Sequence, residues 1–201
     1  LYPVGFALFN RPNVLEEVKR ICWEARLALY FYNGEFYLKY LSASDAGVAT
    51  LDDSNILGLT LSVDYTSTES LVTRLRATYN ASYLPLAPDE KQKEIILRHN
   101  VSKYGLNTQD EYFHIYNIRE LVLKSATFWL IRLANTWKTV TVTVPHTLFA
   151  LDSLDTVIVD LAQDHFAVGE ISCFIESAIF NPDTNTIQLT LVTGIKAGET
   201  T

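Results

Sequence analysis

The clearest pattern in the chain is a change of hydrophobic period near residue 138. Large apolar residues recur at three- and four-residue steps over 120–137, which predicts an α-helix with one buried stripe. The period then becomes two, so Val140, Val142 and Val144 share one face of a strand that a proline ends. A second strand, TVIVDL, follows an acidic bend. We expect the helix to pack against these two strands as an antiparallel pair.

A helix followed by a hairpin is predicted near the start of the sequence. Asn13 and Glu16 have the spacing of a capping box, in which the asparagine oxygen accepts an early N–H of the helix. Asn33 and Gly34 stand between two aromatic-rich runs and tolerate the positive φ angles of a type I′ turn. The pattern therefore indicates a helix beginning at residue 13 and a β-hairpin over 30–40.

The rest of the chain predicts mainly strands. Apolar alternation favours strands at 57–65, 70–79, 110–118 and 187–193, and residues 169–180 are expected to form a strand pair or one long bent strand. The stretch between Asp89 and Gly105 is predicted to be a short helix, with the aspartate as its cap and the glycine beyond its end. Residues 1–8 are expected to form an edge strand and residues 50–56 a polar connector.

These elements indicate an α+β fold that is rich in β-structure. We expect antiparallel sheets in a barrel-like domain, a long packed helix, and a smaller helix–hairpin subdomain. The turn-rich segment 64–69 is the predicted boundary. It divides the chain into a helix-and-hairpin subdomain, 1–66, and a β-barrel-like subdomain, 67–201, which contains the helix 120–137.

Composition and charge narrow the class of protein. The 201 residues are 48% hydrophobic, which is enough for a folded core. A net charge of −7 without any basic run argues against nucleic-acid binding, and no apolar stretch approaches the ~18 residues of a membrane helix. Because the chain has no methionine, we expect a fragment of a longer protein. Cys22 and Cys173 are expected to be buried free thiols, with a disulfide as the alternative.

The candidate catalytic and metal-binding groups do not form a recognised arrangement. The four histidines are distant in sequence and have no accompanying cysteine pair, so a zinc spacing is absent: His99, His114, His146 and His165. The chain has no Gly-x-Ser-x-Gly nucleophile motif and no phosphate-binding glycine loop. Carboxylate pairs such as Asp110 and Glu111 fit solvated turns. We predict that the protein is not an enzyme and has no catalytic residues, no cofactor and no metal.

The aromatic hairpin is the candidate binding surface. Tyr30, Tyr32, Tyr37 and Tyr40 lie in its two runs, where aromatic rings could stack on a sugar. Cross-strand packing of aromatic rings is the commoner role of such residues. A carbohydrate- or receptor-binding module that uses the hairpin 30–40 is therefore the alternative function.

The order of motifs resembles one family. After the helix and hairpin come the following: Thr-Arg-x-x-x-x-Tyr-Asn at 73–80, Tyr-Gly at 104–105, a long Ala/Trp helix, and Leu-x-x-x-Asp-x-Val at 151–157. Over about Ser70–Val192 this order resembles the hub proteins of phage tail tips and baseplates. The chain has Leu154 where that family usually has a glycine before the aspartate, so we expect a different turn conformation there.

This resemblance implies a structural role in the central hub domains of a phage tail. Such hubs are trimers whose β-barrels form a ring that closes the tail tube. The implied partners are other tail proteins and two further copies in a homotrimer, with no specific nucleic-acid binding and no membrane segment. The implied location is the virion tail, after synthesis in the host cytoplasm. A strand that alternates valine with threonine has one core face and one mildly polar face, which can line a ring or meet a neighbour. A net negative charge would keep a conduit for DNA from binding the DNA that passes through it.

Overall fold

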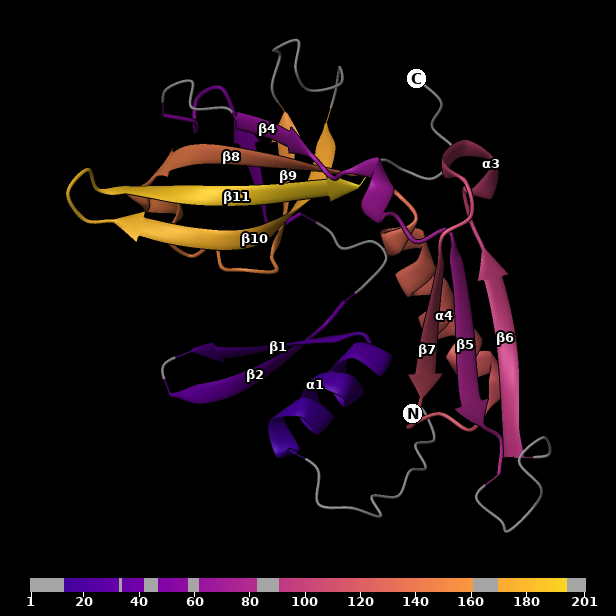
Figure 1. The fold of residues 1–201 in the computed structure, drawn as a ribbon. Coiled ribbons are helices and arrows are strands. Elements are labelled where there is room, and N and C mark those ends of the chain that lie inside the picture. The colour runs from indigo at the N-terminus through magenta and orange to yellow at the C-terminus, as the bar shows by residue number, and fades with distance from the viewer. Residues whose placement is uncertain are drawn as a thin grey trace. The chain divides into compact units, whose positions relative to one another are not determined.

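A computed structural model describes residues 13–32, 34–41, 47–57, 62–82, 91–160 and 170–194 (Figure 1). Its contacts divide the chain into two compact units. Unit 1 comprises Leu1–Ala43 and Leu71–Ala134, and unit 2 comprises Ser44–Ser70 and Asn135–Thr201. The chain therefore passes from one unit to the other more than once. The predicted domains 1–66 and 67–201 divide the chain at another place, and they stay a prediction about independent folding.

Unit 1 combines a helix and hairpin with a small sheet covered by a helix (Figure 1). Its elements are α1 (Val14–Glu24), β1 (Leu27–Tyr32), β2 (Glu35–Tyr40), β5 (Arg74–Asn80), β6 (Gln92–Arg98), α3 (Val101–Tyr104), β7 (Thr108–Phe113) and α4 (Arg119–Leu133). The central strand β5 pairs antiparallel with β6 and parallel with β7. β1 and β2 form a separate antiparallel pair.

The helix and hairpin predicted near the start of the chain are confirmed. Asn13 precedes α1, and its side-chain oxygen accepts the backbone N–H of Leu15 at 3.0 Å. Gly34 lies between β1 and β2 with a φ of +85°, a left-handed conformation that a residue without Cβ adopts at no steric cost. The sequence therefore specifies this region locally, through a cap and a turn.

The core of unit 1 lies between α4 and the three-stranded sheet. Leu75, Ala77 and Tyr79 of β5 and Phe113 of β7 are buried there, opposite one face of α4. That face is formed by small and branched residues, namely Val122, Ala126 and Leu130. Because alternate residues of β5 point to one face, Leu75, Ala77 and Tyr79 are buried together.

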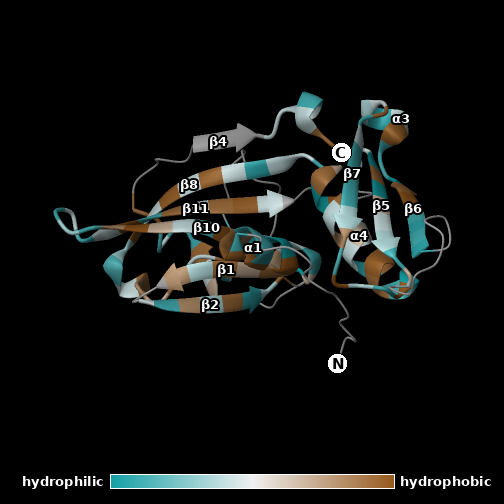
Figure 2. Ribbon diagram, turned by 60° about the horizontal axis from the view of Figure 1, so that its bottom comes forward, coloured by the Kyte–Doolittle hydropathy of each residue, from teal (hydrophilic) through white to brown (hydrophobic). Residues whose placement is uncertain are grey.

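Unit 2 is built on one six-stranded sheet. Its elements are β3 (Ala49–Asp52), β4 (Ser62–Tyr65), η1 (Thr68–Ser70), β8 (Trp137–Pro145), η2 (His146–Leu148), β9 (Thr156–Asp160), β10 (Ile171–Asn181) and β11 (Thr186–Gly194). The strand order is β3-β9-β10-β11-β8-β4, antiparallel except for the β3–β9 pair. Hydropathy alternates along the strands (Figure 2), and Val140, Val142 and Val144 of β8 are buried as predicted.

The α+β class with mainly antiparallel sheets and a long helix is confirmed. The barrel is not: in the described residues the end strands β3 and β4 of the six-stranded sheet are not paired with each other, so this sheet is open. β10 is one long strand with an irregularity between Ile175 and Ser177. Such a bulge bends the strand without closing the sheet.

The predicted extent and packing of the long helix are wrong. Helix α4 ends at Leu133, and Ala134 is its C-cap, so Trp137 belongs to β8 instead of the helix. The helix packs in unit 1 on β5 and β7, whereas β8 and β9 lie in unit 2 and are not neighbours in their sheet. Periodicity identifies the buried face of a helix, but it does not identify the surface that covers that face.

Two further local predictions are wrong, and some fall outside the described residues. Residues 92–98 form the strand β6, because β5 offers an edge that this isoleucine-containing segment completes. Within the expected connector 50–56, residues 50–52 belong to β3, which pairs with β9. The expected edge strand 1–8 and the predicted cap Asp89 lie outside the described residues.

The turn that contains Leu154 has a residue in the left-handed conformation, and its expected difference from the family's turn stays a prediction. Leu154 has a φ of +72°, a left-handed conformation in which glycine is usual. Its N–H donates to the Ile175 carbonyl at 2.6 Å. Asp155 closes the turn, because its side chain accepts the backbone N–H of Asp152 at 3.0 Å. These bonds hold a leucine in a conformation that costs roughly 1–2 kcal/mol.

Candidate functional site

The β1–β2 hairpin of unit 1 is the predicted binding surface, and its register sorts its side chains onto two faces. One face consists of directly opposed apolar pairs, here called the apolar strip: Leu27 with Tyr40, Leu29 with Leu38, and Phe31 with Phe36. Successive residues of a strand alternate between faces, so Tyr30 and Tyr37 lie on the other side. Phe31 and Phe36 are 63% and 71% exposed. Within the part of the chain that the structure describes, this apolar face is therefore most exposed near the turn of the hairpin.

The structure separates the four predicted tyrosines. The rings of Tyr30 and Tyr37 stack on each other, with centroids 5.4 Å apart. Tyr40 lies on the opposite face, where the guanidinium carbon of Arg26 is 4.9 Å from its ring centroid. Tyr32 ends β1, and its side chain lies outside the described residues. The four tyrosines thus do not form one joint platform on a single face, and their role in binding stays a prediction.

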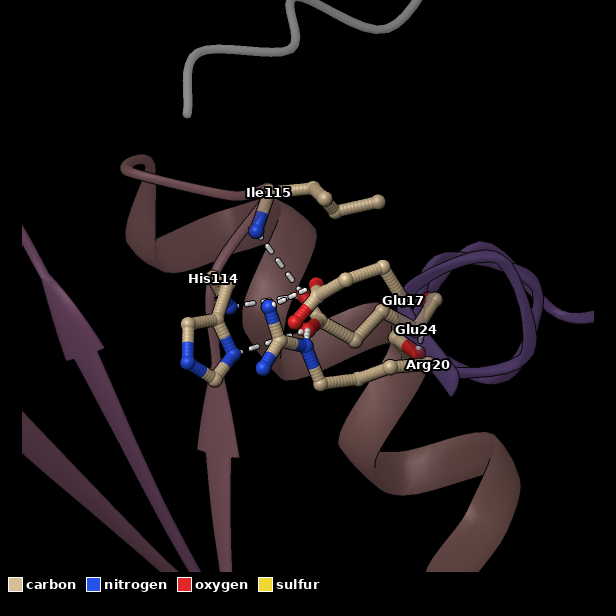
Figure 3. Close-up of polar contacts among 6 residues, drawn as sticks. Glu17, Arg20, Glu24, His114 and Ile115 are labelled. Atoms are coloured by element: carbon tan, nitrogen blue, oxygen red, sulfur yellow. Dashed lines mark hydrogen bonds and ion pairs between the residues drawn. The ribbon is translucent and has the colours of Figure 1, made fainter. Parts of the chain in front are cut away.

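A buried carboxylate joins α1 to the segment that follows β7. Glu24, the last residue of α1, is fully buried. One carboxylate oxygen accepts the backbone N–H groups of His114 and Ile115 at 2.8 and 2.9 Å. The other lies 3.3 Å from Nδ1 of His114 and 4.0 Å from Nε of Arg20 (Figure 3). Arg20 also pairs with Glu17, one turn earlier on the helix.

Burial dominates the protonation chemistry of this cluster. Desolvation raises the pKa of Glu24 above its usual 4.5, although the two backbone N–H donors and Arg20 act to lower it. Desolvation, followed by the charge of Arg20, lowers the pKa of His114 below 6.5. A glutamate beside a histidine is a common acid–base pair. Here, however, the carboxylate has no exposed surface and one of its oxygens accepts two backbone N–H groups, so the pair has a structural role.

Two further contacts fix the end of α1 on α4. The Ser125 hydroxyl donates to the backbone carbonyl of Glu24 at 2.6 Å, and the indole N–H of Trp129 donates to that of Trp23 at 2.8 Å. The rings of Trp23 and Trp129 stack with centroids 5.2 Å apart. Trp129, which lies within the predicted helical segment 120–137, is therefore a docking residue for α1.

The remaining candidates of the sequence do not converge in the described part of the chain. Among the described residues, no three His, Cys, Asp or Glu side chains gather to hold a metal ion, and His165 lies outside them. Cys22 and Cys173 are buried free thiols, as predicted. Burial raises the pKa of Cys173 to about 11, so this thiol is protonated at neutral pH. No helix in the described residues is long and apolar enough to span a membrane.

Comparison with solved structures shows the fold of this chain in several tail and virion proteins. It matches a chain of the virion of a native gene transfer agent particle over 90% of its length, with a TM-score of 0.63 and 13% identity. It matches the tail protein of Neisseria meningitidis over 94%, with a TM-score of 0.57 and 12% identity. The third match, a 43 kDa tail protein of prophage MuSo2 from Shewanella oneidensis, covers 92%, with a TM-score of 0.54 and 13% identity.

These matches confirm the resemblance to phage tail proteins at the level of the fold. The chain spans 38%, 57% and 56% of the three matched chains, so it corresponds to a part of each. No protein-family model and no curated protein matches the sequence. The fold is thus retained at an identity too low for sequence comparison to detect.

Three of the motif residues that suggested the resemblance, Thr73, Tyr79 and Gly105, have structural roles in unit 1. The Thr73 hydroxyl donates to the carbonyl of Gly105 at 2.6 Å and accepts the N–H of Asn107 at 2.9 Å. Tyr79 is buried in the core. The Glu24 junction was missed by sequence analysis, because its partners follow about ninety residues later in the chain and no local pattern marks it.

Proposed function

We propose that this protein is a structural component of a phage or phage-derived tail tip or baseplate hub, and that it assembles as a ring that closes the tail tube. The observation that supports this proposal is the shared fold over 90–94% of the chain with tail and virion proteins. The partners are other tail proteins and further copies of the chain in a homotrimer. The location is the virion tail, after synthesis in the host cytoplasm.

The distribution of polar groups supports a scaffold without enzymatic activity. The side chain of Glu24 is sealed from solvent. One of its oxygens accepts two backbone N–H groups, and the other faces His114 and Arg20. Unit 2 has an apolar core, and threonines occupy the alternate positions of β8. Such a mildly polar sheet face can meet a neighbour or line a ring without unsatisfied buried groups.

The test of this proposal is the mass of the purified chain. A ring-forming homotrimer has three times the 22.7 kDa of one chain, which light scattering coupled to size-exclusion chromatography resolves directly. Electron microscopy of the same sample then shows whether the trimers have a central opening. A stable monomer at all concentrations, or a trimer without an opening, contradicts the proposed ring.

The exposed aromatic residues of the hairpin favour one alternative, a carbohydrate- or receptor-binding module over 30–40. Tyr37 and Tyr40 are 37% and 46% exposed. If the module is correct, glycan-array binding is lost on changing Tyr37→Ala and Tyr40→Ala and is kept in a control such as Tyr104→Ala. A trimer without glycan affinity would exclude this alternative.

A further inference from the structure

A cavity of about 330 Å³ opens in unit 1 beside the junction of α1 and α4. Two segments distant in sequence supply its apolar wall: Ile21, Ala25 and Leu27 from one, and Ile115, Tyr116 and Leu121 from the other. Cavities of this size in proteins bind small ligands or the anchor side chain of a partner. The adjacent Glu24 junction holds the two walls together, so the cavity is preformed.

Two cations complete the wall. Arg26 and Lys124 line the cavity, and among the described lining residues there is no carboxylate. The guanidinium carbon of Arg26 lies 4.9 Å from the ring centroid of Tyr40 and 5.2 Å from that of Phe128, so two aromatic rings orient it. The charged residues of the cavity wall are thus positive, whereas the chain as a whole has a net charge of −7. The cavity is therefore suited to an apolar group that carries a carboxylate beside it.

The apolar strip of the hairpin continues from this cavity. Leu27 lines the cavity together with Tyr40, and these two residues are also the first opposed pair of the strip. The third pair, Phe31 and Phe36, lies four residues further along, which is about 13 Å at about 3.3 Å per residue. This distance corresponds to about four residues of extended chain. The surface fits several residues of an extended polypeptide whose alternate side chains face the strip.

We propose that the cavity and the apolar strip bind a segment of another polypeptide in which apolar residues alternate with acidic ones. One apolar side chain at the end of the partner segment fills the cavity, and the carboxylate of the next residue, where the extended run ends, meets Arg26 and Lys124. The remaining apolar side chains cover the strip. The inference rests on the proposed function at one point only, namely that the partner is another tail protein.

The charge preference is tested with labelled peptides of matched length in a fluorescence anisotropy titration of the full chain. The probes are peptides that alternate leucine with glutamate, leucine with glutamine, and leucine with lysine. We expect the glutamate peptide to bind most tightly and the double variant Arg26→Gln, Lys124→Gln to weaken it about fivefold, as for two partly exposed ion pairs. The control Arg98→Gln removes an exposed cation of β6 and should leave binding unchanged.

The strip is tested with neighbouring residues of β2 that point to opposite faces. Leu38→Gln should weaken the glutamate peptide about tenfold, since it removes apolar contact area, and Lys39→Gln should have no effect. Circular dichroism and thermal unfolding confirm that each variant is folded. Equal binding of the glutamate and lysine peptides, or equal effects of the two β2 variants, would overturn the proposal.

A small probe separates this proposal from a site for free metabolites. Phenylbutyrate has an apolar group and a carboxylate that match the cavity, but it is too short to cover the apolar strip. If phenylbutyrate binds and the glutamate peptide does not, the polypeptide partner is wrong. The mass of the same sample distinguishes the two proposals: a trimer that binds no peptide contradicts this inference alone, and a monomer that binds the peptide contradicts the ring alone.

Discussion

At the scale of single residues, Glu24 shows how one buried group can tie two distant segments together. A fully buried carboxylate is costly unless its oxygens are occupied. Here the backbone N–H groups of His114 and Ile115 supply that compensation, and they would themselves be unsatisfied without the carboxylate. The end of α1 and the segment after β7 are therefore mutually dependent.

Removing the Glu24 carboxylate should lower the free energy of unfolding more than neutralising it does. Glu24→Ala leaves two buried N–H groups without an acceptor, at about 1–3 kcal/mol each. Glu24→Gln keeps an acceptor oxygen, so its cost should stay below about 1 kcal/mol, the net value of a typical hydrogen bond. Urea unfolding measures both values. The exposed Glu16→Ala on the same helix is the control, and equal losses for the alanine and glutamine variants of Glu24 would contradict this account.

The pH dependence of this junction has a defined sign. Because burial raises the pKa of folded Glu24, its contribution to stability is fully present below the unfolded value of 4.5 and is lost as the pH rises through the folded value. Wild type should therefore lose stability relative to Glu24→Gln as the pH rises above 4.5 and through the raised pKa of folded Glu24. Unfolding both chains in a His114→Gln background removes the histidine titration. A difference that grows in favour of wild type as the pH rises would refute the prediction.

Leu154 offers a test of backbone strain. At a φ of +72°, β-branched residues are the least tolerated and asparagine is among the most tolerated. Leu154→Val should therefore be less stable than Leu154→Asn by about 1 kcal/mol or more. At Leu148, which is half-buried in η2 without a positive φ, the order should reverse because burial decides. Thermal unfolding of the four variants checks this, and the same order at both positions would exclude strain as the cause.

At the scale of elements, the sequence predicts local structure correctly, but it does not predict which elements pack against each other. The Asn13 cap, the Gly34 turn and the alternating valines of β8 each depend on a few neighbouring residues, and the sequence contains those signals. The segment 92–98 was misread because its pairing with β5 decides its conformation, and a single sequence does not contain that information. For the same reason, the sequence predicts the buried face of helix α4 but not the sheet that this face packs on.

For the candidate site, too, the local features are predictable from the sequence and the long-range contacts are not. The hairpin and its tyrosines were predictable from the turn and the aromatic runs, whereas the two-faced arrangement follows from the register between β1 and β2. Arg26 and Lys124 are separated by about a hundred residues of sequence, and only the docking of α1 on α4 places both around one cavity. No pattern in the sequence joins them.

β11 is the element on which the sheet of unit 2 depends most. It lies between β10 and β8, and Leu189 in its centre is fully buried. Leu189→Ala should lower the free energy of unfolding by about 2–5 kcal/mol, the range for leucine truncation in a core. Gln188→Ala, one residue away on the exposed face, should change it by less than about 0.5 kcal/mol. Similar losses in the two variants would show that this face is not the core.

At the scale of the whole molecule, the contacts and the sequence suggest different divisions of the chain. The strands β3 and β4 lie within 1–66 but pair with strands of 67–201. We therefore expect residues 67–201 made alone to be less stable than the full chain, because both end strands of the six-stranded sheet are removed. Denaturant unfolding of the truncated and full chains compares them. Equal stability of the shared sheet would favour the division predicted from the sequence.

The strand order of unit 2 also determines when its sheet can form during synthesis. A ribosome delivers β3 and β4 first, then β8, β9 and β10, and β11 after all of these. Since β11 separates β8 from β10, the growing chain holds two incomplete halves, β4 with β8 and β3 with β9 and β10, until the final strand emerges. Unit 1 has all its described strands by residue 113 and its covering helix by residue 133. The two units are thus completed in succession, and the nascent six-stranded sheet is the part that needs protection from premature association.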